Sequence, residues 1–191
     1  MPGMEIRPLA LAGLFEIAPA VRRDHRGSLA RLFDVDAFAA AGLTTAWVQE
    51  SRSSTAKRHT VRGLHATLPP SVEGKTITAL HGRMLWVSLD VRKASATFGR
   101  WASLELDAER SNTLYAARGF AHGCVSLADD CELLLRSDMR FVEQHGMGIV
   151  WDDPDLAIDW QLGGATPVIS DRDRQYPTFK HFKETIGGID A

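Results

Sequence analysis

Short segments in which apolar and polar residues alternate are the feature that most constrains how this chain can fold. The clearest example is residues 75–91, "KTITALHGRMLWVSLDV", where Ile77 and Ala79 alternate with threonines. A period of two places apolar side chains on one face of a β-strand. The His81-Gly82 pair can turn the chain before a second, more apolar run, so this stretch predicts a β-hairpin.

Other segments that favour strands recur along the chain, separated by clusters of Gly, Asp, Asn and Arg. The candidates are "TAWVQES" (45–51), "GRWASLEL" (99–106), "TLYAA" (113–117), "GCVSL" (123–127) and "CELLLRS" (131–137). Strands at such regular spacing are typical of a sandwich or barrel rather than of βαβ units. We therefore predict a mainly β fold, a jelly roll, with a few short helices.

Helical signals are confined to two places. The stretch "DVDAFAAAG" predicts one short helix, because Asp34 or Asp36 can cap its start and Gly42 can supply a left-handed residue after its end. The polar segment "PVISDRDRQYPTFKHF" fits a short helix or a packed tail.

Length, composition and charge limit the class of protein. A chain of 191 residues without linker or repeat is expected to form a single domain over 1–191, with a core over roughly 20–160 and terminal extensions packed on it. Hydrophobic residues make up 45% of the chain, which is enough for a sizeable core. The formal net charge of -2 argues against a nucleic-acid partner but leaves room for a local basic pocket.

The sequence also indicates where the protein works. No apolar run is long enough to span a membrane, so no membrane partner is expected. The N-terminal residues lack the basic start and the long apolar region of a signal peptide. Only two cysteines occur, Cys124 and Cys131, and two reduced thiols fit a cytoplasmic protein better than a disulfide framework does.

Two of the seven histidines stand out because each closely follows a glycine: His65 in "RGLH" and His122 in "GFAH". A histidine near a strand end inside a barrel can face a cavity and serve as a base. A histidine that merely ends a strand is the alternative for either one. His81 lies in a predicted turn, and His145 and His181 lie in polar stretches, so these three are expected at the surface.

Motifs for other chemistries are incomplete or missing from the sequence. "RGFAHG" resembles half of a cupin metal motif, but the chain has no His-x-His, so no metal is expected. There is no Gly-x-Ser-x-Gly nucleophile motif and no Gly-rich phosphate loop. A bound phosphate would need arginine, and Arg26 and Arg62 are candidates because each lies beside a glycine. A solvated surface position is the alternative for both arginines.

Several segments, taken in order, resemble one family, the dTDP-4-dehydrorhamnose 3,5-epimerases. The matching pieces are "DHRGSLARLFD", "WVQESRSS", "VRGLHATLPPSVEGKTITALHGRMLWVSLDVRKASATFGRW", "LYAARGFAHGCVSL", "GIVWDDPDLAIDW" and "PVISDRDRQYP", which span roughly residues 10 to 182. The resemblance implies a cupin-type jelly roll, usually a homodimer. It also implies an isomerase without metal or cofactor that acts on a nucleotide-linked 4-keto-6-deoxy sugar in deoxysugar and polysaccharide biosynthesis.

The chemistry of such an epimerase requires a base, a group that stabilises an enolate, and an acid. A ketone at C4 acidifies the hydrogens on C3 and C5, so a base removes one of them and an acid returns a proton to the opposite face. By resemblance, His65 matches the base, Asp173 the carboxylate that orients it, and Lys75 the cation near the enolate oxygen. The residues that match substrate contacts are Arg26, Gln49, Arg62 and His122.

The chain departs from the family pattern at the position of the expected acid. The family has a tyrosine there, and this chain has Leu135, which has no proton to give. Neither of its two tyrosines, Tyr115 and Tyr176, is an obvious replacement, although Tyr176 is close in sequence to Asp173. Further departures, at positions where the family has a glutamate, an asparagine and a glutamine, are Arg31, Ser51 and Thr67. Arg31 reverses a charge in the pocket unless its side chain turns outward to solvent.

Three interpretations remain open at this point. The first is an epimerase with an altered substrate or with a single reacting centre, which uses water or another acid. The second is a full 3,5-epimerase in which another residue supplies the proton. The third is a cupin that binds a sugar nucleotide or another small ligand without turnover. Retention of His65, Lys75 and Asp173 favours an enzyme.

Overall fold

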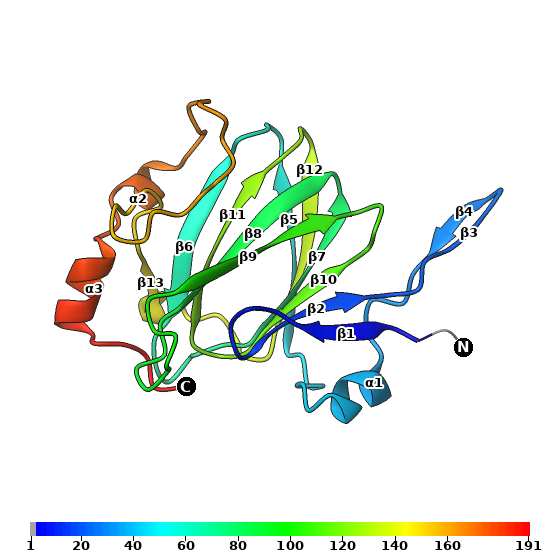
Figure 1. Cartoon of the computed structure of the whole chain (residues 1–191), viewed down its shortest axis with the longest axis horizontal. Coiled ribbons are helices and arrows are strands. Elements are labelled where there is room, and N and C mark those ends of the chain that lie inside the picture. Colours follow the sequence, from blue (N-terminus) through cyan, green and yellow to red (C-terminus); the bar gives the residue numbers. More distant parts are fainter. Residues whose placement is uncertain (1–2) are drawn as a thin grey trace.

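The computed structural model describes residues 3–191 and consists mainly of two antiparallel sheets that face each other (Figure 1). The order in the six-stranded sheet is β1 (Glu5–Pro8), β2 (Leu14–Ala18), β10 (Thr113–Ala116), β7 (Lys75–His81), β12 (Cys131–Ser137) and β5 (Gln49–Thr55). The order in the five-stranded sheet is β13 (Gly146–Gly148), β6 (Val61–Thr67), β11 (Phe120–Ser126), β8 (Arg83–Asp90) and β9 (Trp101–Asp107). The predicted mainly β jelly roll is thereby confirmed.

The hairpin predicted for residues 75–91 is wrong in its pairing, although both of its strands exist. Strand β7 lies between β10 and β12 in one sheet, whereas β8 lies between β11 and β9 in the other. The turn at Gly82, with φ +70°, therefore carries the chain from one sheet to the other. A Cβ at this position would lie 2.7 Å from the sulfur of Cys131, so the close crossing requires glycine.

The remaining predicted strands are present, and all but one have shifted bounds. Strand β12 has the predicted bounds, and β9, β10 and β11 differ from the prediction by a few residues at their ends. Strand β5 starts at Gln49 instead of residue 45 and continues to Thr55. The segment before residue 20 adds two unpredicted strands, β1 and β2, to the edge of the six-stranded sheet.

Helix α1 (Val35–Ala40) is the predicted short helix. Asp34 caps its start by accepting a backbone N–H of the first turn, and Gly42 follows its end in the left-handed region with φ +69°. Phe38 is fully buried and packs edge-on against Tyr115 of β10. The helix therefore covers the face of the six-stranded sheet that turns away from the barrel interior.

Apolar side chains fill only part of the space between the two sheets. Ile77 and Leu133 of the six-stranded sheet pack there with Trp86 and Leu106 of the five-stranded sheet. A second apolar cluster covers the other face of the five-stranded sheet, where side chains such as Phe179 of the C-terminal segment are buried. The space between the sheets that the first cluster leaves open forms a cavity.

The C-terminal segment forms two short helices beside β6 and β13, α2 (Asp171–Arg174) and α3 (Phe179–Thr185) (Figure 1). A 3-10 turn, η1 (Glu143–His145), leads into β13. The hydroxyl of Ser170 caps α2 and accepts the backbone N–H of Asp173. No helix within residues 3–191 is both long and apolar enough to cross a membrane.

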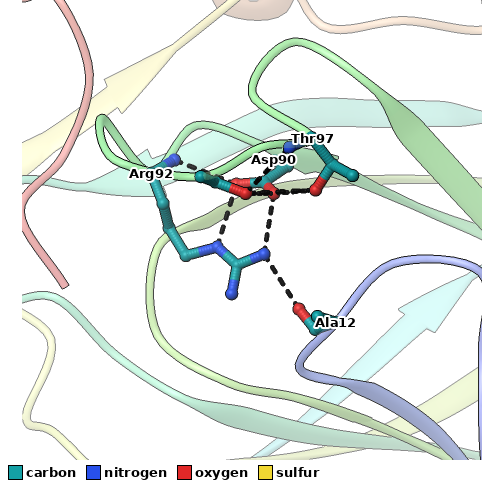
Figure 2. Close-up of polar contacts among 5 residues, drawn as sticks. Ala12, Asp90, Arg92 and Thr97 are labelled. Atoms are coloured by element: carbon teal, nitrogen blue, oxygen red, sulfur yellow. Dashed lines mark hydrogen bonds and ion pairs between the residues drawn. The ribbon is translucent and has the colours of Figure 1, made fainter.

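A buried polar cluster fixes the loop after β8 (Figure 2). Asp90 is fully buried and accepts two side-chain hydrogen bonds from Arg92, at 2.9 and 2.7 Å, and one each from Ser95 and Thr97, both at 2.6 Å. Burial opposes ionisation of Asp90, but these hydrogen bonds lower its pKa to about 2. Arg92 also donates to the carbonyl of Ala12, so the cluster joins the turn between β1 and β2 to the barrel.

A two-stranded hairpin of β3 (Arg22–Asp24) and β4 (Gly27–Leu29) projects away from the barrel (Figure 1). Every residue of these two strands is exposed, including Leu29 at 72%. An exposed leucine on an isolated hairpin is unusual for a monomer, because two strands alone bury too little surface to be stable in water.

Candidate active site

A cavity of about 630 Å³ opens between the two sheets, and its volume is typical of small-molecule sites. Strands β6 and β11 contribute to one wall, and strands β7, β12 and β5 contribute to the opposite wall. Most of the candidate residues meet here although they come from distant parts of the chain: His65, Lys75, Asp173, Arg62 and His122 all line the cavity.

His65 and Asp173 form a hydrogen-bonded pair at the edge of the cavity. The Nε2 atom of His65 lies 2.9 Å from Oδ1 of Asp173, and the N–H of Gly63 donates to Oδ2 at 3.0 Å. The Asp173 side chain is 6% exposed, whereas that of His65 is 44% exposed. The carboxylate is therefore held on both oxygens, and Nδ1 is the nitrogen of His65 that remains available as a base.

The glycine of "RGLH" explains why this pair forms where it does. Gly63 has φ +105°, and a Cβ on it would lie 2.5 Å from the carbonyl oxygen of His122. Only glycine allows β6 to approach β11 this closely. The same close approach brings the backbone N–H of residue 63 to Asp173, so the fold positions the carboxylate through the strand that carries His65.

Lys75 lies on the opposite wall, at the start of β7, and is paired with a carboxylate that the sequence did not single out. Its Nζ is 2.6 Å from Oε1 of Glu73, and the hydroxyl of Ser137 donates to Oε2 of the same carboxylate. Glu73 is 9% exposed and also lines the cavity. The signal that could have identified it is its position two residues before Lys75 in "EGK", on the same approach to the site.

His122 is buried in β11 and belongs to the lining of the cavity. The indole Nε1–H of Trp86, which can only donate, lies 3.3 Å from Nδ1 of His122, and the hydroxyl of Ser88 lies 3.2 Å from it. Burial, followed by the charges of Lys75 and His65, holds the pKa of His122 well below its ordinary value. The imidazole is therefore neutral with its proton on Nε2, and this buried atom has no partner among residues 3–191.

Two arginines lie along the cavity lining. Arg62 of β6 donates to the hydroxyl of Thr55 at 3.3 Å and to the carbonyl of Ser54 at 3.0 Å. Arg172 of α2, which the sequence did not single out, donates to the hydroxyl of Tyr176 at 2.6 Å, and this bond raises the pKa of Arg172. Both residues are exposed, so they add two accessible positive charges to the cavity lining.

Gln49 and Arg26 do not line the main cavity of their own chain. Gln49 borders an adjoining hollow of about 110 Å³ that shares Lys75 with the cavity, and its side-chain oxygen accepts the N–H of Phe141 at 3.1 Å. Arg26 lies in the projecting hairpin, where it pairs with Asp24 at 2.7 Å. The expected contact of Arg26 with the substrate is therefore not made within one chain.

Of the three histidines expected at the surface, two are exposed. His81 and His181 are exposed as predicted. His145 is partly buried, and its Nδ1 lies 2.7 Å from the hydroxyl of Ser71, because η1 folds the "EQH" segment against the loop before β7. His145 is therefore only partly at the surface.

Comparison with known proteins places the chain in one family. The sequence model described as dTDP-4-dehydrorhamnose 3,5-epimerase matches residues 8–181. The dTDP-4-dehydrorhamnose 3,5-epimerase of Mycobacterium tuberculosis strain H37Rv is 36% identical over 93% of this chain and 88% of that protein. The chain belongs to the dTDP-4-dehydrorhamnose 3,5-epimerase family.

Relatives within the epimerase family differ in the number of centres that their names describe. NovW of Streptomyces spheroides, a 4-keto-6-deoxy sugar epimerase, superposes with a TM-score of 0.92 at 31% identity and covers 98% of this chain and 93% of its own. A protein of Streptomyces niveus named dTDP-4-dehydrorhamnose 3-epimerase is 33% identical over 90% of this chain and 82% of that protein. Membership of the epimerase family is therefore compatible with one or two reacting centres.

Leu135 lies in the cavity wall where the epimerase family is expected to have its acid tyrosine. It occupies β12 on the wall opposite His65, and Ser51 of β5 is its partner in register. Both residues border the adjoining small hollow. Thr67 is a buried residue of the main cavity lining, so this departure also alters the site.

Arg31, another departure from the family pattern, does not line the main cavity as Leu135 and Thr67 do. It borders a separate hollow between the projecting hairpin and α1, and its guanidinium pairs with Asp34 at 2.8 Å. Its side chain is 61% exposed. Within one chain, Arg31 therefore turns away from the main cavity and brings no positive charge into it.

Neither tyrosine takes the place of the missing acid. Tyr176 stands edge-on to His65, with ring centroids 5.7 Å apart, but its ring packs on the Cα of Gly148 and its hydroxyl accepts the bond from Arg172. It lies on the His65 side and does not line the cavity. Tyr115 is buried in the apolar cluster under α1.

Proposed function

We propose that the protein is an epimerase of a nucleotide-linked 4-keto-6-deoxy sugar and that it inverts C3, C5 or both. The observation that carries the proposal is the pairing of His65 with the buried carboxylate of Asp173, across one cavity from Lys75. A protein that only binds a ligand has little use for a base, a carboxylate that orients the base, and a cation on the facing wall.

The first step is removal of the proton beside the C4 ketone. Nδ1 of His65 accepts the proton, and the C–H electron pair becomes the enolate, with negative charge on the former ketone oxygen. Asp173 accepts the N–H at Nε2 throughout and stabilises the imidazolium that forms. Because Asp173 is buried and bonded at both oxygens, it holds the ring orientation without reorganising.

Two groups of the cavity lining are suited to stabilise the enolate oxygen. The ammonium of Lys75 uses one N–H for Glu73 and has two left for a ligand. His122 lines the same cavity, and its buried Nε2–H has no partner in the described chain. A fixed charge and a neutral donor in a site of low water content stabilise a developing oxyanion more than they would in water.

The nucleotide diphosphate requires positive charge near the opening of the cavity. Arg62 and Arg172 line the cavity from two separate elements, β6 and α2. A planar guanidinium binds a phosphate through two parallel hydrogen bonds, which fixes the orientation of the ligand as well as its charge. We assign the diphosphate to these two arginines, and the substrate contact of Gln49 to the adjoining hollow.

We also propose a homodimer in which the projecting hairpin of one protomer reaches the cavity of its partner. Leu29 on the hairpin and Val48 beside the edge strand β5 are exposed at 72% and 55%. Exposed apolar residues and an unpaired sheet edge are features that a second copy covers. In this arrangement Arg26 contacts the substrate of the partner protomer, which reconciles its expected role with its distance from its own cavity.

A cytoplasmic location is consistent with the thiols. Cys124 and Cys131 are both free and buried in the barrel, and burial raises the pKa of Cys124 to about 12. A thiol in that state is protonated and unreactive. Free, unreactive thiols suit a reducing compartment.

The direct test is product formation with dTDP-4-keto-6-deoxyglucose and with its UDP and GDP counterparts, followed by proton NMR of the inverted centres. We expect inversion at C3, C5 or both with at least one of these substrates. A binder without turnover, the alternative that Leu135 suggests, would give saturable binding in calorimetry and no inverted product with any of them.

A further inference from the structure

Inversion of a carbon needs a proton donor on the face opposite the base, and this requirement rests on the function proposed above. His65 belongs to β6 of the five-stranded sheet. A carbon whose proton it removes must regain a proton from the facing six-stranded sheet. The leucine at position 135 on that sheet has no proton to donate, so another group of the same wall must supply it.

The residues that line the cavity limit which group can be the proton donor. The residues that line it from the six-stranded sheet and the loop into β7 are Ser53, Glu73, Lys75, Leu133 and Leu135. Of these five, only Glu73 and Lys75 exchange a proton readily in water, and they form one ion pair at 2.6 Å. The second oxygen of Glu73 accepts the hydroxyl of Ser137, so the carboxylate is engaged on both sides and the ammonium is the group with free N–H bonds.

The strand register places Lys75 close to the position where the tyrosine is missing. Lys75 pairs with Ser137 of β12, and Leu135 lies two residues along the same strand, on the same face of the sheet. A free lysine ammonium and a free tyrosine phenol have similar acidities in water, with pKa values of roughly 10.4 and 10. An ammonium can therefore replace a phenol as an acid without a large change in driving force.

We propose that Lys75 is the proton donor that completes inversion in this protein. After His65 has taken the proton, the enolate double bond supplies two electrons to a new C–H bond. The proton comes from Nζ of Lys75, and the N–H bond that breaks leaves its electron pair on the neutral amine. The ketone reforms as the charge on the enolate oxygen is withdrawn. His65 then loses its proton to solvent and Lys75 gains one from solvent, which restores both groups.

Lys75→Arg separates this role from simple charge stabilisation. Arginine keeps the positive charge for the enolate, but its guanidinium does not give up a proton in proteins. The His65 ring is 44% exposed, so its captured proton can exchange with solvent and return to the same face. In D2O we expect this variant to keep incorporating deuterium at the reacting carbon without inversion, while inverted product falls by about 100-fold or more.

Five outcomes decide between the alternatives. Inversion by Lys75→Arg at the wild-type rate overturns the proposal and points to water beside Leu135 as the donor. Equal loss of exchange and inversion in a folded protein also overturns it, because Lys75 would then act on proton removal alone. If Lys75→Arg does not fold, as judged by circular dichroism, Lys75→Gln is used. Inversion by that variant contradicts a lysine donor. Loss of inversion with continued deuterium exchange supports one, and loss of both overturns it.

A rescue experiment tests whether a new proton donor restores the step that Lys75→Arg removes. In the Lys75→Arg background, Leu135→Tyr supplies a phenol from the facing wall, and we expect inverted product to return. Leu135→Phe in the same background has the ring without the hydroxyl and should not restore it; restoration by both variants would contradict the proposal. Failure of the proposed function is distinguishable, because the wild-type protein would then show neither exchange nor inversion with any 4-keto sugar nucleotide.

Discussion

Nε2 of His65 lies 2.9 Å from Oδ1 of Asp173, across 108 residues of sequence. The contact determines which nitrogen of the imidazole is free, and it commits Asp173 to stabilising positive charge on the ring. It also links β6 to α2, so the barrel and the C-terminal segment must both be in place for the base to work.

Asp173→Asn should leave the ring near its position but remove the charge that stabilises the imidazolium. We expect kcat to fall by roughly 10²- to 10⁴-fold, with a much smaller change in KM. Steady-state kinetics of inversion measure both values. Asp171→Asn, at an exposed position of the same helix, is the matched control and should behave like the wild type. A wild-type kcat in Asp173→Asn would mean that the pair is structural.

Leu135→Tyr in the otherwise unchanged protein should add a second donor to the wall opposite His65. We expect faster inversion at one centre, because a phenol in this position can protonate a carbon that Lys75 serves poorly. NMR of the C3 and C5 protons measures the rate at each centre separately. Leu135→Phe controls for the ring itself, and an equal gain in that variant would attribute the effect to packing.

His122 should make stability depend on pH. Its folded pKa lies well below the ordinary value of 6.5, so below that pH the unfolded chain binds a proton that the folded chain does not. The stabilisation is therefore present above about pH 6.5 and is lost as the pH falls. Thermal unfolding from about pH 8 to about pH 5 should show a steeper loss for the wild type than for His122→Gln, which does not titrate. Parallel curves would contradict a neutral buried His122.

The Asp90 cluster should matter for stability and not for the chemistry. Asp90→Asn leaves Arg92 without its charged partner, so we expect a loss of about 3 kcal/mol in the free energy of unfolding, measured in urea. The folded pKa of about 2 is below the ordinary 3.8, so this stabilisation is present above pH 3.8 and is lost as the pH falls toward 2. The exposed Asp152 provides the control Asp152→Asn. A loss in Asp90→Asn no larger than in that control would contradict this account.

Arg26 offers a test of the dimer. If it acts on the partner's cavity, Arg26→Ala should raise KM. In a mixed dimer of Arg26→Ala and inactive His65→Ala, one of the two sites then combines an intact His65 with an intact Arg26 supplied by the other protomer. In a randomly mixed dimer about a quarter of the sites should regain wild-type kinetics at low substrate concentration. Activity no higher than the sum of the two separate variants would place Arg26 outside the partner's site.

The strands could be predicted from the sequence better than the pairing between them could. The alternation in "KTITALH" and "CELLLRS" identifies β7 and β12, because the period of two is a local property. The crossing at Gly82 depends on contacts with Cys131, almost fifty residues away, and no local pattern reports it. Strand β6 was missed because Gly63 and His65 interrupt its apolar pattern, and both are there for the site.

The site could be predicted only where family resemblance supplied the long-range contacts. His65, Lys75 and Asp173 meet as that resemblance implied. Glu73 and Arg172 were missed, since a carboxylate or a guanidinium looks like any solvated side chain until the fold places it in a cavity. Arg26 shows the opposite limit, because the partner contact that we propose for it cannot be located from one chain.

The measurement that tests the central claim most directly is incorporation of solvent deuterium into a nucleotide-linked 4-keto-6-deoxy sugar, compared between the wild type and His65→Ala. We predict that the wild type exchanges the hydrogen at C3 or C5 and that His65→Ala, with its fold checked by circular dichroism, exchanges neither. Exchange at the wild-type rate in His65→Ala would contradict the assignment of His65 as the base.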